Sequence, residues 1–131
     1  MSFLAKFFID GKEYNVLQCN YKLNQPIDEV GKPIGRPRGG QITLAVESTQ
    51  DTELYYWMTE PNQTKDGTIV FYKRDTMAKQ KALDFSKGFC IAYEEDFTAD
   101  DKEPMITYIT ISAQTMKLQS IEFKNLWGVT E

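Results

Sequence analysis

Residues 31–48 read Gly-Lys-Pro-Ile-Gly-Arg-Pro-Arg-Gly-Gly-Gln-Ile-Thr-Leu-Ala-Val-Glu-Ser. The first ten of them hold two prolines, four glycines and three cations but no acid, and such a run of proline and glycine excludes a helix. Ile42, Leu44 and Val46 then alternate with polar residues, which predicts a half-buried strand. The loop before this strand is longer than a tight turn requires. It is therefore either an idle surface loop or a segment that orders against another molecule.

The chain before this loop predicts two antiparallel strands. Residues 3–9 alternate in hydrophobicity, and the dipeptide at residues 10–11 is Asp-Gly, which favours a hairpin turn. The apolar residues of the returning strand change face near Val16 and Leu17, so we expect a bulge there or a strand that is buried on both faces.

One short flanking helix is predicted over about residues 50–59. Its apolar face consists of Leu54, Trp57 and Met58. Ser48 or Thr49 is expected to cap its start, and Pro61 ends it. A helix this short is marginal alone, so its apolar face must pack against the strands.

Later segments predict more strands and two further turns. The strands are expected at residues 68–74, 83–85, 89–93, 105–112 and 116–123. The turns are expected at residues 65–67 and 86–88. A chain of mainly short strands closes most economically as an antiparallel β-barrel or a two-sheet sandwich, because closure removes unpaired edges. We therefore expect a single mainly β domain over residues 1–131, with an extended loop at about 27–40.

Composition narrows the function classes. The chain has 131 residues, 41% of them hydrophobic, and a net charge of −4, which disfavours nucleic acid as a partner. It shows neither a secretory signal nor the roughly 18 consecutive apolar residues of a membrane span, so we expect a protein made in the cytoplasm. Cys19 and Cys90 lack metal-ligand spacing and are expected to be reduced, although a disulfide between them remains open.

Catalytic chemistry is not indicated. The sequence contains no histidine and no phosphate-binding loop. The adjacent carboxylates Glu94 and Glu95 would point to opposite faces of a strand, which argues against a glycosidase pair. The acidic stretch at residues 94–103 lacks the glycine-centred aspartate ladder of a calcium loop. We therefore expect no enzyme activity, no cofactor and no metal site.

Charge is distributed unevenly along the chain. The loop carries Lys32, Arg36 and Arg38, whereas residues 94–103 hold six acids against one lysine. These complementary segments predict that the chain binds copies of itself. The candidate contact residues are Lys32, Ile34, Arg36, Arg38, Glu94, Glu95, Asp96, Asp100 and Asp101.

Four segments together carry a resemblance to a known family. They are residues 2–17 (SFLAKFFIDGKEYNVL), 35–44 (GRPRGGQITL), 63–75 (QTKDGTIVFYKRD) and 103–113 (EPMITYITISA). In their order and spacing they resemble the type VI secretion tube protein family, Hcp or TssD, in its Bacteroidetes-type branch. The resemblance extends over nearly the whole chain.

The resemblance implies a β-barrel that assembles as a six-membered ring. Such rings stack head to tail into a hollow tube, which a contractile sheath expels from the cell. The implied partners are the sheath, spike and baseplate proteins. It implies secretion without a cleaved signal peptide, possible effector cargo in the lumen, and contact of the loop at 27–40 with the adjoining ring. The alternative from another class is a monomeric lipocalin-like barrel that carries a small apolar ligand.

Overall fold

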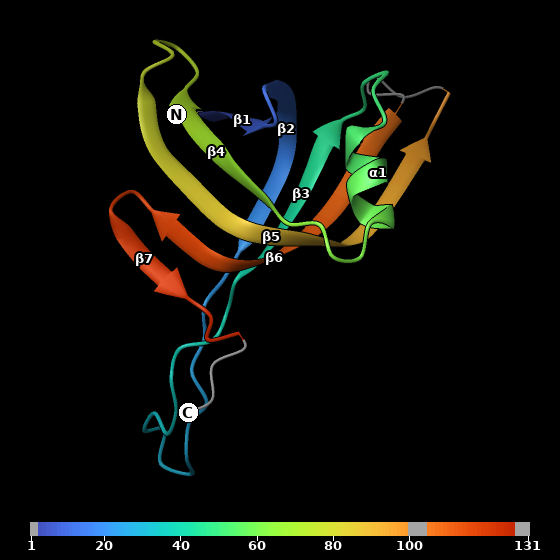
Figure 1. Cartoon of the computed structure of the whole chain (residues 1–131). Helices are drawn as coiled ribbons and strands as arrows, with labels where there is room; N and C mark the ends of the chain where they lie inside the picture. Colours follow the sequence, from blue (N-terminus) through green and yellow to red (C-terminus); the bar gives the residue numbers. More distant parts are fainter. Residues whose placement is uncertain (1–2, 100–104, 128–131) are drawn as a thin grey trace.

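The computed structural model describes residues 3–99 and 105–127, and most of them lie in antiparallel strands (Figure 1). The elements are β1 (Phe3–Ile9), β2 (Lys12–Tyr21), β3 (Gln41–Glu47), α1 (Glu53–Thr59), β4 (Lys65–Lys73), β5 (Lys79–Phe97), β6 (Met105–Leu118) and β7 (Ile121–Lys124). Neighbouring strands pair in the order β3-β2-β1-β4-β5-β6-β7, and β3 also pairs with β6. The pairing of β3 with β6 closes strands β1 to β6 into a six-stranded barrel, which confirms the barrel prediction. β7 lies outside the barrel and pairs only with β6.

The two longest strands replace several short ones that the sequence predicted. β5 runs unbroken through residues 83–97, because the expected turn at residues 86–88 is a local irregularity within the strand. Lys87 has a φ of +52° there, and Gly88 lies against Phe85 and Ile111. The buried face of β5 shifts by one residue at this irregularity: Leu83 and Phe85 are buried before it, Gly88 and Cys90 after it, and Ile91 is exposed.

Two other predicted boundaries are also wrong. Residues 65–67 belong to β4, where Gly67 pairs with Ile9 and Phe85 instead of making a turn. A side chain at Gly67 would lie 2.7 Å from the ring of Phe85, so the glycine serves a close approach between strands. The predicted single strand at 116–123 is a hairpin, because the chain reverses at Gln119, which has a φ of +57°.

The bulge in the second strand is confirmed, since the pairing of β2 with β3 shifts register between Val16 and Gln18. The helix is also confirmed, but it begins later than predicted, at Glu53. Asp51 supports its start by accepting the backbone N–H of Glu53 at 3.1 Å. The expected capping residue Ser48 is occupied elsewhere, because its hydroxyl lies 2.7 Å from that of Thr107.

The barrel interior is filled by side chains. The largest fully buried ones are Trp57, Phe7, Ile42, Leu44, Ile69, Leu83, Ile109, Ile111 and Val46. Trp57 of α1 stacks on Phe85 with ring centroids 6.5 Å apart, which shows that the helix is part of the core. A packed interior distinguishes this barrel from the hollow barrels that carry small ligands.

The segment between β2 and β3, residues 22–40, projects from one end of the barrel (Figure 1). We call this segment the arm. α1 and the end of β5 lie at the opposite end, close to the last residue of β3 (Figure 1). The fold therefore separates the two charged segments that the sequence singled out.

Candidate functional site

The arm is an ordered two-stranded ribbon. Asn24 and Arg38 exchange two backbone hydrogen bonds, of 2.9 and 2.6 Å, and the N–H of Ile34 donates to the carbonyl of Pro26 at 3.0 Å. These cross-links hold the two sides of the arm together without support from the barrel. This segment is thus a hydrogen-bonded ribbon and not an irregular loop.

Asp28 shapes the tip of the arm. Its carboxylate accepts the backbone N–H groups of Val30 at 3.0 Å and Lys32 at 2.9 Å, which makes a tight turn. Gly31 takes a φ of +86° in this turn, a conformation that favours glycine. The turn therefore follows from aspartate and glycine at these positions.

Apolar side chains of the arm are exposed. The exposed fractions are 60% for Ile27, 86% for Val30 and 65% for Ile34. No barrel residue packs over them in the described structure, and three large apolar residues on one thin ribbon are typical of a contact surface. Ile34 was predicted as a contact residue, whereas Ile27 and Val30 were not.

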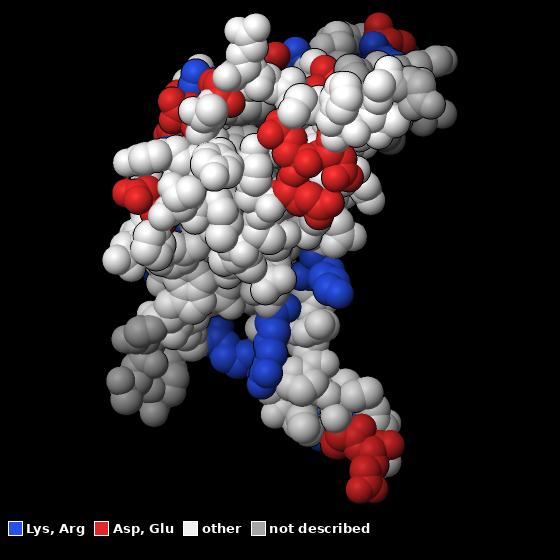
Figure 2. Space-filling model, turned by 90° about the vertical axis from the view of Figure 1, so that its right-hand side faces the viewer, with Lys and Arg blue, Asp and Glu red and all other residues white. Residues whose placement is uncertain are grey.

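Basic side chains gather at the root of the arm (Figure 2). Arg36 and Arg38 line a hollow of about 200 Å³ together with Lys124, the last residue of β7. Lys32 lies nearer the tip, where Asp28 and Glu29 add negative charge. Within the described residues the two ion pairs, Lys6–Glu13 and Lys65–Asp10, lie outside the arm. Neither of these ion pairs involves Arg36 or Arg38.

The acidic candidates that the structure describes lie at the other end of the barrel. Glu94, Glu95 and Asp96 end β5 and pair with residues 106–108 of β6, which also face the last residues of β3. The arm joins β3 at its first residue, so β3 spans roughly 20 Å between the two charged regions. The structure thus does not bring the predicted basic and acidic residues together within one chain. Asp100 and Asp101 lie outside the described residues.

Glu94, Glu95 and Asp96 are all exposed, but their hydrogen bonds within the chain differ. Glu94 and Asp96 are exposed and share one face of β5, because side chains alternate along a strand. Glu95 points the other way and accepts hydrogen bonds from Tyr93 and Thr107, each of 3.3 Å. We therefore distinguish the acidic face, Glu94 and Asp96, from the internally bonded Glu95.

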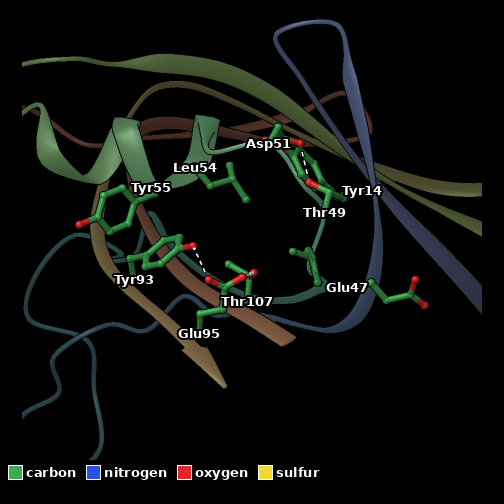
Figure 3. A pocket seen from close by; sticks show the side chains of 10 residues that line it. Tyr14, Glu47, Thr49, Asp51, Leu54, Tyr55, Tyr93, Glu95 and Thr107 are labelled. Carbon is green, nitrogen blue, oxygen red and sulfur yellow. Dashed lines mark hydrogen bonds between the residues drawn. The ribbon is translucent and has the colours of Figure 1, made fainter. Parts of the chain in front are cut away.

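Glu95 belongs to a polar network beside α1 (Figure 3). Thr107 donates its single hydroxyl proton to Glu95, so the hydroxyl of Ser48 donates to Thr107 across 2.7 Å. Burial, together with the charge of Glu95, raises the pKa of Tyr93.

A small hollow beside this network is bordered by a second hydrogen bond, from Tyr14 to Asp51 (Figure 3). Burial, aided by this bond, raises the pKa of Tyr14. Burial opposes ionisation of Asp51, but bonds from Thr49, Tyr14 and the Glu53 backbone lower the pKa of this carboxyl. The enclosed space is only about 10 Å³, enough for a water molecule at most. These groups stabilise the helix end of the barrel and do not form a ligand site.

Three further findings concern the described residues alone. No cluster of three or more acidic or cysteine side chains in residues 3–99 and 105–127 could hold a metal ion. No helix in this part of the chain is both long and apolar enough to cross a membrane. Cys19 and Cys90 are free thiols.

A family model for "TssD: Hemolysin coregulated protein Hcp (TssD)" matches residues 1–128. The structure is similar to Hcp1 from Flavobacterium johnsoniae, with 38% sequence identity and a TM-score of 0.89 over 93% of this chain and 99% of that one. Comparison with curated proteins gives no significant match.

More distant structures share the fold. Hcp1 from Salmonella typhimurium has a TM-score of 0.74 at 13% identity, over 90% of this chain and 86% of that one. A chain of the PVC sheath-tube complex, an extracellular contractile injection system in its extended state, has a TM-score of 0.56 at 19% identity, over 88% and 87%.

Proposed function

The chain belongs to the Hcp (TssD) family of type VI secretion tube proteins, and we propose that its copies form six-membered rings that stack head to tail into the hollow inner tube. The observation that carries this proposal is the 38% identity to Hcp1 of Flavobacterium johnsoniae over nearly the full length of both chains. Proteins of this family are structural and not enzymatic, they build tubes that work with a sheath, and they are secreted by the type VI system.

This role implies further partner proteins and a location for the tube. We propose that the tube is assembled in the cytoplasm on a baseplate, inside a contractile sheath, and that contraction expels it behind a spike into the medium or a target cell. Small effectors would travel in the lumen. Neither nucleic acid nor membrane insertion has a part in this mechanism.

The arm is the proposed connector between rings. Head-to-tail stacking joins two different surfaces, and this chain presents different surfaces at the two ends of its barrel. The basic root of the arm, with Arg36 and Arg38, would face the acidic end of the next ring, where Glu94 and Asp96 are exposed. Opposite charges orient such a contact and speed its formation.

Stacking is stabilised by weak contacts that are repeated around the ring. A single exposed ion pair contributes only about 0 to 1 kcal/mol. Apolar burial of Ile27, Val30 and Ile34 would add to it, at about 25 cal/mol for each Å² removed from water. Because every subunit of a ring makes the same contact, weak contacts act together through multivalency.

The proposal is tested by electron microscopy of the purified chain together with its mass in solution. We expect rings with a central hole and a light-scattering mass of six times the 15.1 kDa chain. A monomer without rings would contradict the proposed assembly, and an extractable lipid in such a monomer would favour the ligand-carrying alternative.

A further inference from the structure

Three elements meet where the arm leaves the barrel. Asn125, the residue after β7, donates both hydrogens of its side-chain amide: to the carbonyl of Gly39 in the arm at 3.1 Å and to the carbonyl of Ala113 in β6 at 3.0 Å. Its backbone N–H donates to Gln114 at 2.7 Å. The N–H of Ala113 in turn donates to Gly40 at 2.8 Å. One side chain thus links the root of the arm to the barrel wall.

The chemistry of this link suits a primary amide. Both partners of the side chain are carbonyl oxygens, which only accept hydrogen bonds, so the nitrogen of the amide must face them. A primary amide has two hydrogens on one nitrogen and satisfies both carbonyls at once. Aspartate has nearly the same shape but would place a carboxylate against them.

The packing at the root leaves no room for another arrangement. Gly40 has a φ of +95°, and a Cβ there would lie 2.2 Å from the amide nitrogen of Asn125 and 2.7 Å from the carbonyl oxygen of Ala113. A Cβ at Gly39 would lie 2.3 Å from Leu23 on the other side of the arm. Gly40 lets the arm approach β6 closely enough for the amide to reach both carbonyls, and Gly39 lets the two sides of the arm lie close together at its root.

We propose that Asn125 is a positioning residue that fixes the direction in which the arm leaves the barrel. β7 is not a barrel strand, but its pairing with β6, from Leu118↔Ile121 to Thr115↔Lys124, places Asn125 at the root. The arm keeps its own shape through the bonds between Asn24 and Arg38, so the side chain controls the orientation of a preformed ribbon. The consequence for tube assembly rests on the proposed function.

The test compares rings of the wild type with those of Asn125→Ala and Asn125→Asp. Asn62→Asp, in the exposed turn after α1, is the matched control because it makes the same change of shape and charge. Amide hydrogen exchange is measured at single residues. The exchange rate of Ala113, whose N–H donates to Gly40, shows whether the root stays closed, and the rates of Asn24 and Arg38 show whether the arm keeps its own hydrogen bonds. Tube assembly is measured as the amount of chain released into the medium by cells that carry the complete secretion apparatus.

We expect both Asn125 variants to form rings in which Ala113 exchanges about tenfold faster while Asn24 and Arg38 keep their rates. Release of the chain should fall several-fold in these variants and stay unchanged in the control. Unchanged exchange at Ala113 would overturn the inference, and so would loss of rings, because Asn125 would then support the barrel itself. Faster exchange with normal release would uphold the positioning role and instead overturn the proposed role of the arm in stacking.

Discussion

The hydroxyl of Tyr14 on β2 donates a hydrogen bond of 2.9 Å to the carboxylate of Asp51, which lies 37 residues later in the chain. The same carboxylate accepts the backbone N–H of Glu53, the first residue of α1. Tyr14 is 3% exposed and packs against Phe7, with ring centroids 5.9 Å apart. The contact therefore anchors the start of the helix to the barrel wall.

Tyr14→Phe should lower the free energy of unfolding at pH 7 by about 1 to 2 kcal/mol, because a hydrogen bond to a charged group is lost. The pKa of Tyr14 is raised from its ordinary 10.0, so the folded protein keeps this proton after the unfolded chain has lost it. Wild-type stability should thus fall as the pH rises above about 10, and less steeply in the variant. Urea unfolding from pH 7 to 11 measures both effects.

Tyr56→Phe is the matched control for this substitution. Tyr56 is exposed on α1 and makes only a long bond of 3.4 Å to Glu60. We expect its effect to stay within about 0.5 kcal/mol. If the two variants lost stability equally, the contact between Tyr14 and Asp51 would not anchor the helix.

Trp57→Ala should destabilise the protein by about 3 to 5 kcal/mol, because it opens a cavity in the core. Trp57 is fully buried, stacks on Phe85, and donates its indole N–H to the carbonyl of Gln63 at 3.2 Å. Trp57→Phe should cost less, since it keeps much of the packing. Thermal unfolding measures both, with the exposed Tyr56→Ala as control. Equal effects for Trp57→Ala and Tyr56→Ala would contradict a core role for the helix.

Periodicity and turn chemistry predicted the elements in which local pattern and tertiary structure agree. The Asp10-Gly11 hairpin, the bulge near Val16 and the buried face of α1 are of this kind. The prediction from the sequence was wrong at Gly67 and Gly88. The segments Lys-Asp-Gly and Ser-Lys-Gly are typical of turns, but here they lie within strands. Glycine there makes room for Phe85, and that need arises only once strands distant in sequence have paired.

The candidate site was predictable where it depends on charge and not where it depends on proximity. Lys32, Arg36 and Arg38 lie on the arm as expected. Asn125 could not be found from the sequence, because it contacts a residue 86 positions away and a single asparagine forms no pattern. The acidic residues lie at the far end of the barrel because of the strand register, which the sequence alone did not specify.

Cys19 and Cys90 should react slowly with thiol reagents in the folded protein. Burial raises the pKa of both thiols from 9.0 to about 11, and only the thiolate is reactive. The labelling rate at pH 7 to 9 should therefore rise about tenfold for each pH unit. A colorimetric thiol assay measures this rate, with the urea-unfolded chain as control. Cys90 is buried and Cys19 is half-buried, so fast labelling of the folded protein at pH 7 would contradict the raised pKa of these thiols.

Ile27→Ser combined with Ile34→Ser should weaken tube assembly without changing barrel stability. Both side chains are exposed on the arm, so their loss should change the free energy of unfolding by less than about 0.5 kcal/mol. Sedimentation of assembled tubes and thermal unfolding of rings measure the two effects. Ile121→Ser replaces a similarly exposed isoleucine on β7 and serves as control. Normal assembly of the double variant would show that the arm does not bury these residues.

Charge reversal tests the contact between rings directly. Arg36→Glu with Arg38→Glu should leave rings intact and prevent stacking, because the root of the arm would then repel the acidic face of the next ring. Glu94→Lys with Asp96→Lys should do the same from the other surface. Electron microscopy of the purified variants measures the fraction of rings that are stacked.

The decisive variant combines all four reversals. If Arg36 and Arg38 face Glu94 and Asp96 across the ring junction, the combination restores opposite charges and should recover most of the stacking. Stacking should also decrease with added salt in the wild type and in the combined variant, since exposed charges are screened over about 10 Å at 0.1 M. If the combined variant stacks no better than either pair alone, the arm docks on a different surface. Normal stacking of the Arg36→Glu, Arg38→Glu variant would show that the basic root takes no part in the contact between rings.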